Sequence, residues 1–322
     1  MIRIAADLGG ADRPQQELIE GAVRAVRELD DLYLYVTGDA KALSPCVEGV
    51  ERLELVDAPE VITNSEDPTE AFKNKKNSTL IRALELCKSD ADIGGFVSCG
   101  PTGAIFVASM MLLGRIARVS PMLLVELKRA DGTPICIVDC GANVDCRAEK
   151  LVDFARMGTA YMKAVGIADP VTALLSNGAE DKKGSEVVKK ANALLRESGL
   201  NFSGNTEANG ILEGSADVIV CDGFSGNVLL KSIEGSGKAV IAEWRRLAAE
   251  AGIKDSASEQ IMQRLYKKYD HNTQGGAVLL GTRLPVIKGH GAATSETVCN
   301  IIKSACKLAA NGLTDKIRQE FN

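Results

Sequence analysis

Five loops of this chain carry the residue types that bind an anion. Each follows a short apolar segment and combines glycines with hydroxyl, amide, carboxylate or ammonium side chains. Glycine lets the backbone approach a ligand closely, and the N-terminus of a following helix presents free N–H groups to it. The sequence therefore predicts a site for a phosphate-like anion. The candidate residues are Asp7, Gly9, Gly10, Ser98, Gly100, Thr102, Gly103, Asp139, Asn143, Asp145, Glu180, Lys183, Asp222 and Asn227.

The side chains of this set suggest separate tasks. Ser98 and Thr102 offer hydroxyl donors, and Lys183 offers a point charge suited to phosphate. The carboxylates need another purpose beside an anion, either orienting Lys and Asn side chains or capping the helices that follow. Glycine and Asn after strands are also common turn residues, and Ser or Thr before a helix is a common cap. Five such loops at the carboxyl edge of one sheet favour a binding site over turns alone.

Two further residues could take part in chemistry. His290, one of only two histidines, follows a Gly-rich stretch and could protonate a leaving group. A histidine in such a loop also often has a purely structural role. Cys99 lies in the Ser98–Gly103 turn, where a helix N-terminus could lower its pKa and make it a nucleophile. The common alternative is an inert buried thiol.

The sequence indicates neither a metal nor a nucleotide cofactor. Cys136, Cys140 and Cys146 lie close together, but their spacing follows no familiar zinc pattern. There is no GxxxxGK[ST] motif, and the first glycine pair is not part of a GxGxxG. We therefore expect no cofactor.

The strands and helices that would position these residues alternate along the chain. Apolar runs of strand length alternate with segments of helical period, which predicts a doubly wound α/β fold with a mostly parallel sheet. The expected strands are Ile2–Ala6, Leu32–Val36, Leu53–Val56, Ile93–Val97, Met122–Leu127, Ile135–Val138, Val171–Leu175 and Val218–Val220. The expected helices are Pro14–Leu29, Ser78–Cys87, Gly103–Gly114, Arg147–Ala164, Gly184–Glu197 and Ser295–Asn311.

The C-terminal third contains a different pattern. Gly226–Gly252 reads as one long helix, and a polar break separates it from a second helix over Ser258–Asp270. This predicts a projecting helical hairpin over residues 226–270. No Pro-rich or Gly/Ser-rich linker interrupts the chain, so we expect residues 1–322 to form a single catalytic α/β domain.

Charge and cysteine content argue against a nucleic-acid-binding protein and against a secreted one. The net charge of −5 argues against a nucleic-acid footprint, which needs a basic face. The nine cysteines are odd in number and form no CxxC pair, and the N-terminus shows no signal-peptide pattern. We expect a cytoplasmic protein. No run reaches the roughly 18 apolar residues of a membrane span.

Several of these motifs together resemble the phosphate acyltransferase family of phospholipid synthesis. The resemblance covers residues 1 to 291, and its most specific parts are Gly-Ala-Asn-Val-Asp at 141–145 and Asp-Gly-Phe-x-Gly-Asn at 222–227. It implies a fold like that of isocitrate dehydrogenases and phosphotransacetylases. The sequence departs from the family pattern at Ala11, Pro101, Ser176 and Ala179.

The resemblance also implies a reaction and its partners. A fatty acyl group would pass from acyl carrier protein to inorganic phosphate, giving an acyl phosphate for phospholipid synthesis. It implies a homodimer and, at most, peripheral contact with the inner face of a membrane. An acyl-CoA-dependent enzyme and a non-catalytic acyl-carrier-binding homologue are the alternatives. A basic patch to meet the carrier could draw on Arg24, Arg27, Lys73, Lys75, Lys76, Arg245 and Arg246.

A mechanism follows if phosphate attacks the thioester directly, since a thioester is already activated. The protein must then hold phosphate near the carbonyl carbon and stabilise the developing oxyanion. In this hypothesis Lys183 binds phosphate, and Asn143 or Asn227 donates to the oxyanion. Asp145 and Asp222 orient those donors.

Overall fold

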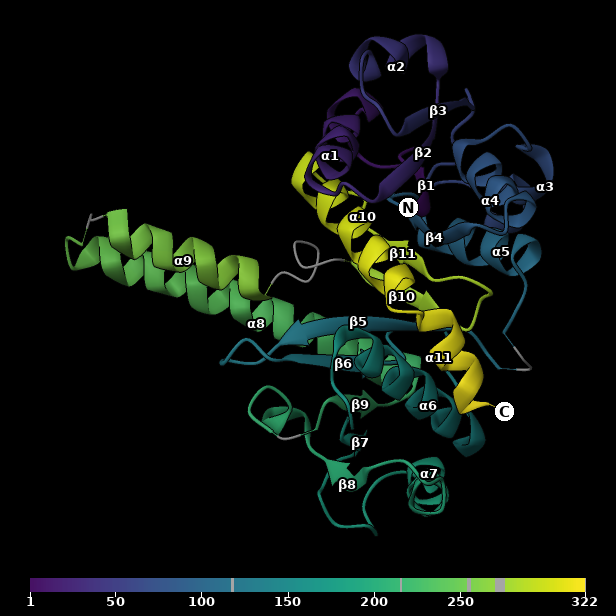
Figure 1. The fold of residues 1–322 in the computed structure, drawn as a ribbon. Coiled ribbons are helices and arrows are strands. Elements are labelled where there is room, and N and C mark those ends of the chain that lie inside the picture. Colours follow the sequence, from purple (N-terminus) through teal and green to yellow (C-terminus); the bar gives the residue numbers. More distant parts are fainter. Residues whose placement is uncertain (117–118, 215, 254–255, 270–275, 322) are drawn as a thin grey trace.

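One 11-stranded sheet runs through the molecule (Figure 1). The computed structural model describes residues 1–322 except 117–118, 215, 254–255, 270–275 and 322. The strand order is β3-β2-β1-β4-β11-β10-β5-β6-β9-β7-β8. The strands are β1 (Ile2–Asp7), β2 (Leu32–Gly38), β3 (Leu53–Asp57), β4 (Ile93–Ser98), β5 (Met122–Lys128), β6 (Pro134–Val138), β7 (Thr172–Leu175), β8 (Phe202–Thr206), β9 (Val218–Val220), β10 (Ala277–Leu280) and β11 (Val286–Lys288).

Helices cover both faces of the sheet. In Figure 1, α1 and α10 lie side by side against the upper half, while α6 and α11 cover the lower half. Buried apolar side chains from α1, α6, α7, α10 and α11 share one core cluster, and α3, α4 and α5 pack on the opposite face of β1 and β4. The helices are α1 (Gln15–Glu28), α2 (Ala40–Val47), α3 (Pro68–Asn74), α4 (Thr79–Ser89), α5 (Thr102–Leu112), α6 (Ala148–Val165), α7 (Glu186–Arg196), α8 (Gly223–Glu250), α9 (Ser256–Tyr269), α10 (Ser295–Ala310) and α11 (Leu313–Glu320).

The strand directions divide the sheet into two halves. Strands β1, β2, β3, β4 and β11 are parallel, and β6, β7, β8 and β9 form a second parallel group. Between them the pairs β11–β10, β10–β5 and β5–β6 are antiparallel, so the second group runs opposite to the first. The expected mostly parallel α/β fold is confirmed. The expected single carboxyl edge is wrong, because these reversals separate the loops after β1 and β4 from those after β6, β7 and β9.

The sequence pattern missed several short elements. Strands β10 and β11 have four and three residues and lie in a Gly-rich stretch, where hydrophobic period gives little signal. Their pairing with β5 and β4 defines them instead. Strand β8 is polar and pairs with β7 at the end of the sheet, and α2 carries Pro45 in its interior. The helices α3 and α11 also lie outside the expected set.

The expected hairpin is present. Helices α8 and α9 pack against each other and project from the body of the molecule (Figure 1). Helix α8 begins at Gly223, three residues before the expected start, because Asp222 caps it. The expected polar break spans residues 253–257, but α9 already begins at Ser256, two residues before its expected start. Residues 254–255 and the expected end at Asp270 lie outside the described residues. Among the described residues, no helix is long and apolar enough to cross a membrane.

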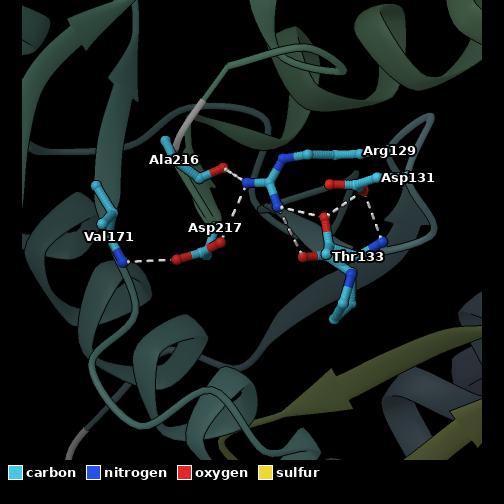
Figure 2. A network of polar contacts seen from close by, with 7 residues as sticks. Arg129, Asp131, Thr133, Val171, Ala216 and Asp217 are labelled. Carbon is cyan, nitrogen blue, oxygen red and sulfur yellow. Dashed lines mark hydrogen bonds and ion pairs between the residues drawn. The ribbon is translucent and has the colours of Figure 1, made fainter.

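A largely buried ion pair joins the β5–β6 hairpin to the start of β9 (Figure 2). Arg129 donates to the carboxylate of Asp217 at 3.1 Å and to the carbonyl of Ala216, and its other terminal nitrogen donates to Thr133. The second oxygen of Asp217 accepts the backbone N–H of Val171 at 2.9 Å. The two charged side chains are only 11% and 14% exposed. The network thereby fixes three segments that enter the lower half of the sheet.

Candidate active site

Asp7 and Ser98 form the base of the first group of loops. Asp7 is buried at the end of β1 and accepts hydrogen bonds from Ser98 Oγ at 2.7 Å and from the backbone N–H of Gly9 at 2.8 Å. Burial raises the pKa of Asp7, and these hydrogen bonds oppose that rise. Ser98 Oγ in turn accepts the N–H of Gly100. The single hydroxyl proton of Ser98 is thus used on Asp7, and the pair shapes the turn that precedes α5.

The N-terminus of α5 is left open by its capping residue. Pro101 occupies the N-cap and makes no side-chain hydrogen bond to the helix. Its ring lies against Gly10, where a Cβ would come within 2.9 Å of Pro101 Cδ, and the φ of Gly10 is +73°. The helix therefore begins with Thr102 and Gly103 exposed and with backbone N–H groups that no side chain caps.

Asp139 organises the loop after β6. Its fully buried carboxylate accepts the backbone N–H groups of Leu123, Ala142 and Asn143. The amide nitrogen of Asn143 donates to the same carboxylate and to the carbonyl of Pro121. Both protons of the Asn143 amide are therefore used inside the loop. Asn143 acts as part of the scaffold in this arrangement.

The start of α8 packs directly on this loop. Asp222 caps the helix by accepting the N–H and the hydroxyl of Ser225 at 2.8 and 2.9 Å, which confirms a capping role. A Cβ on Gly226 would lie 2.0 Å from the carbonyl oxygen of Asp139, and one on Gly223 would lie 2.8 Å from that of Asn143. Only glycine permits such an approach. The loop and the helix are thus fixed as one unit.

A cleft of 790 Å³ brings the two groups of loops together. Its wall contains Thr102 from the start of α5, Gly141 from the loop after β6, Asn227 from α8, and His290 from the loop after β11. Residues from loops and helices of both halves of the sheet therefore border one space. Within the described residues, the amide of Asn227 forms no hydrogen bond, so it remains available to a ligand.

One hydrogen bond orients the ring of His290 in this cleft. Its Nδ1 accepts the backbone N–H of Ala292 at 3.1 Å, which requires a lone pair on Nδ1. The proton of the neutral ring therefore lies on Nε2. The ring is exposed and lines the cleft, so in this tautomer the Nε2–H is the donor that it can offer to a ligand.

Cys99 does not have the surroundings of a nucleophile. Its side chain is fully buried, and burial, with the nearby Asp7 carboxylate, raises the pKa of the thiol to about 12. A reactive thiolate needs a lowered pKa and access to solvent. The buried-thiol interpretation of Cys99 therefore holds, and all nine cysteines are free.

Other candidates lie beside a second cavity, of 1020 Å³, on the other side of α8. Asp145, Ser176 and Asp222 line it together with Gly184. Glu180 and Lys183 are exposed on the loop that contains Gly184, and Lys183 lies across Gly178, with Cγ 2.7 Å from the position a Cβ would take there. The structure thus brings Thr102, Asn227 and His290 together at the first cleft. Asp145 lines the second cavity, and Lys183 is exposed on the loop that leads to Gly184.

Sequence reasoning missed three lysines of the cleft. Lys231 and Lys238 extend from α8, and Lys288 ends β11. Lys231 stands one helical turn beyond Asn227, a spacing that could have been noticed. Lys288 belongs to a strand that the sequence pattern did not predict. No cluster of His, Cys, Asp or Glu suited to a metal occurs among the described residues.

Comparisons with known proteins agree on fold and family. The fold resembles the EutD phosphotransacetylase from Staphylococcus aureus (TM-score 0.62, 16% identity, 96% of this chain and 94% of that chain). It also resembles a branched-chain phosphotransacylase from Enterococcus faecalis (TM-score 0.61, 15% identity, 96% and 99%). These likenesses confirm the expected phosphotransacetylase-like fold.

Sequence comparison identifies the family itself. A family described as "Fatty acid synthesis protein" matches residues 2–316. The phosphate acyltransferase of Geobacillus thermodenitrificans is 39% identical, with 99% of each chain covered. That of Caldanaerobacter subterraneus is 38% identical, with 99% of this chain and 97% of the relative covered. The chain belongs to this family, and it is an acyltransferase of the phosphate acyltransferase type.

Proposed function

We propose that the protein transfers a fatty acyl group from acyl-[acyl carrier protein] to inorganic phosphate, and that the acyl phosphate enters phospholipid synthesis. The observation that carries this proposal is the cleft between the two halves of the sheet. It combines an uncapped helix N-terminus at Thr102, ammonium groups, and the amide of Asn227. Such a cleft offers donors for a phosphate and for a carbonyl oxygen in one space.

The proposed reaction is a direct displacement. A phosphate oxygen attacks the thioester carbonyl carbon, and a carbon–oxygen bond forms as negative charge develops on the carbonyl oxygen. The tetrahedral intermediate then collapses, the carbon–sulfur bond breaks, and the thiolate leaves on the carrier's prosthetic arm and takes up a proton from solvent. The buried Cys99 thiol supports a route without an acyl-enzyme intermediate.

The proposed roles follow the geometry of the cleft. Asn227 and the Nε2–H of His290 donate to the oxyanion, and Asp139 holds the loop against which Asn227 packs. Asp7 and Ser98 position the turn before α5. Asp145 lines the second cavity and Lys183 lies on the exposed loop beside it, so both retain a proposed role in contacting the donor rather than phosphate.

A thiol-release assay tests the proposal. We expect the protein to release free thiol from acyl carrier protein only when phosphate is present, and much more slowly from acyl-CoA. Sulfate in place of phosphate serves as the control, because its charge is similar but it is a poor nucleophile. Faster release from acyl-CoA would favour the CoA-dependent alternative. Absence of release from both donors would favour a non-catalytic binding protein.

We also propose the homodimer that the family resemblance implies. Val240, Trp244 and Leu247 lie at helical spacing on α8 and are 70%, 44% and 47% exposed. An exposed apolar stripe of this kind marks an interaction surface. A second copy of the 34.1 kDa chain is the proposed partner, and a light-scattering mass of one chain would contradict it.

A further inference from the structure

Lys288 is the half-buried cation of the cleft. It is the last residue of β11 and pairs in register with Ser98 at the end of β4. This pairing places Lys288 at the same end of the sheet as the turn leading to α5. Gly289 follows directly, and a Cβ there would lie 2.8 Å from Cys99 Sγ. The close packing of Gly289 fixes the backbone from which Lys288 reaches the cleft.

Among the described residues, Lys288 forms no ion pair with a carboxylate. Burial lowers the pKa of Lys288, the nearby Cys99 opposes this, and the positive charge of Lys231 lowers it further. Within the described part of the chain, no carboxylate lies at ion-pair distance from Lys288 or Lys231. Glu234 and Glu296 also line the cleft, beside three lysines. Two neighbouring ammonium groups without a shared acid are unfavourable unless an anion binds between them.

We propose that Lys288, together with Lys231, binds the acceptor phosphate. The inference rests on the proposed phosphate acyl transfer and names the residues that hold the acceptor. Two ammonium groups match the charge of a phosphate dianion, and lysine binds phosphate as a point charge. Thr102 lines the same cleft and adds a hydroxyl donor. Asn227 precedes Lys231 by one helical turn, so the anion lies near the proposed oxyanion donor.

Lys183 is a weaker candidate than Lys288 for binding the acceptor phosphate. Lys183 is exposed and lies across Gly178 on the loop beside the second cavity. A charge in open solvent is screened and contributes less than one at a half-buried site. The fold therefore favours the lysine at the end of β11 over the one that the sequence pattern indicated.

The test is the phosphate dependence of thiol release in Lys288→Met, which keeps the length of the side chain and removes its charge. We expect the KM for phosphate to rise about tenfold or more, as for loss of a charged hydrogen bond. The KM for the acyl donor should stay unchanged. A rise in the donor KM with an unchanged phosphate KM would overturn the inference, because the anion would then be the phosphodiester of the carrier's arm.

Matched variants separate charge from packing. Lys88→Met removes an exposed lysine at the far end of α4 and should keep both KM values. Lys288→Arg keeps the charge and should retain most of the phosphate affinity. Lys231→Met changes an exposed side chain, so it should fold and also raise the phosphate KM. If Lys288→Met fails to fold, Lys231→Met decides the question, and an unchanged phosphate KM there overturns the inference.

A binding measurement distinguishes this inference from the proposed function. Phosphate should raise the melting temperature of the wild-type protein and of Lys88→Met, but not that of Lys288→Met. If the wild-type protein releases no thiol with phosphate, the proposed function fails. If it does, and Lys288→Met shows the wild-type phosphate KM and melting shift, only the assignment of Lys288 fails.

Discussion

At the scale of single residues, hydrogen bonds decide which candidates remain available to a substrate. The amide of Asn143 donates both of its protons, to Asp139 and to the carbonyl of Pro121. The hydroxyl of Ser98 likewise donates its proton to the carboxylate of Asp7. Within the described residues, Asn227 forms no hydrogen bond. Two side chains with the same chemistry therefore have different roles, because a donor already bound to a buried acceptor cannot reach a ligand without leaving that acceptor unpaired.

Substitutions of His290 test whether its ring acts as a hydrogen-bond donor. If the ring acts through its Nε2–H, His290→Gln should keep turnover within about tenfold, because the amide N–H of Gln can replace that donor. His290→Ala should lose about 10²-fold or more, as for loss of one oxyanion donor. Steady-state kcat with saturating phosphate measures both. Equal losses in the two variants would point to proton transfer by the ring instead.

At the scale of elements, the first turn of α8 connects the buried scaffold to the cleft. Asp222 caps the helix, Gly223 and Gly226 contact the loop after β6, and Asn227 and Lys231 extend from the next turn into the cleft. One helix thereby sets the distance between the loop of Asp139 and the proposed oxyanion donor. The opposite face of the same turn lines the second cavity through Phe224 and Val228.

Gly226→Ala tests this element. The added Cβ would lie 2.0 Å from the carbonyl oxygen of Asp139, so α8 must shift away from the loop. We expect a loss of about 1–3 kcal/mol in the free energy of unfolding, as for overpacking, and at least tenfold lower turnover. Gly235→Ala on the same helix is the control, because no atom lies within 4 Å of its Cβ position. It should be neutral or stabilising; equal behaviour of the two variants would refute the close-approach argument.

At the scale of the whole molecule, β10 and β5 join two parallel groups of opposite direction into one sheet. Residues from both groups of strands line the 790 Å³ cleft, including Thr102 at the start of α5 and Gly141 in the loop after β6. Arg129 and Asp217 stabilise the lower group, since their buried pair connects the β5–β6 hairpin to the entries of β7 and β9 (Figure 2). Besides Asp217, Arg129 donates hydrogen bonds to the Thr133 hydroxyl and to the backbone carbonyl of Ala216, so we assign the pair a structural role.

Arg129→Met provides the prediction for this tertiary network. Removing the guanidinium leaves the Asp217 carboxylate buried with the N–H of Val171 as its remaining donor, and we expect a loss of about 3–5 kcal/mol in stability. Urea denaturation measures it. The double variant with Asp217→Asn should recover part of that loss, because no charge is then left unpaired. A single variant within about 1 kcal/mol of the wild type would show that the pair contributes little.

The sequence by itself determined the alternating α/β order, the projecting hairpin, the Gly-rich loops and the family. These features depend on local patterns: apolar runs of strand length, helical period, and glycine where a backbone must approach closely. Only the tertiary structure decided that β10 and β11 complete the sheet, that the loops fall into two groups, and that Lys288 rather than Lys183 lines the same cleft as Asn227. The physical reason is that a three-residue strand such as β11 has too few residues to show a period, and its pairing with β4 places Lys288 beside residues almost two hundred positions earlier in the chain.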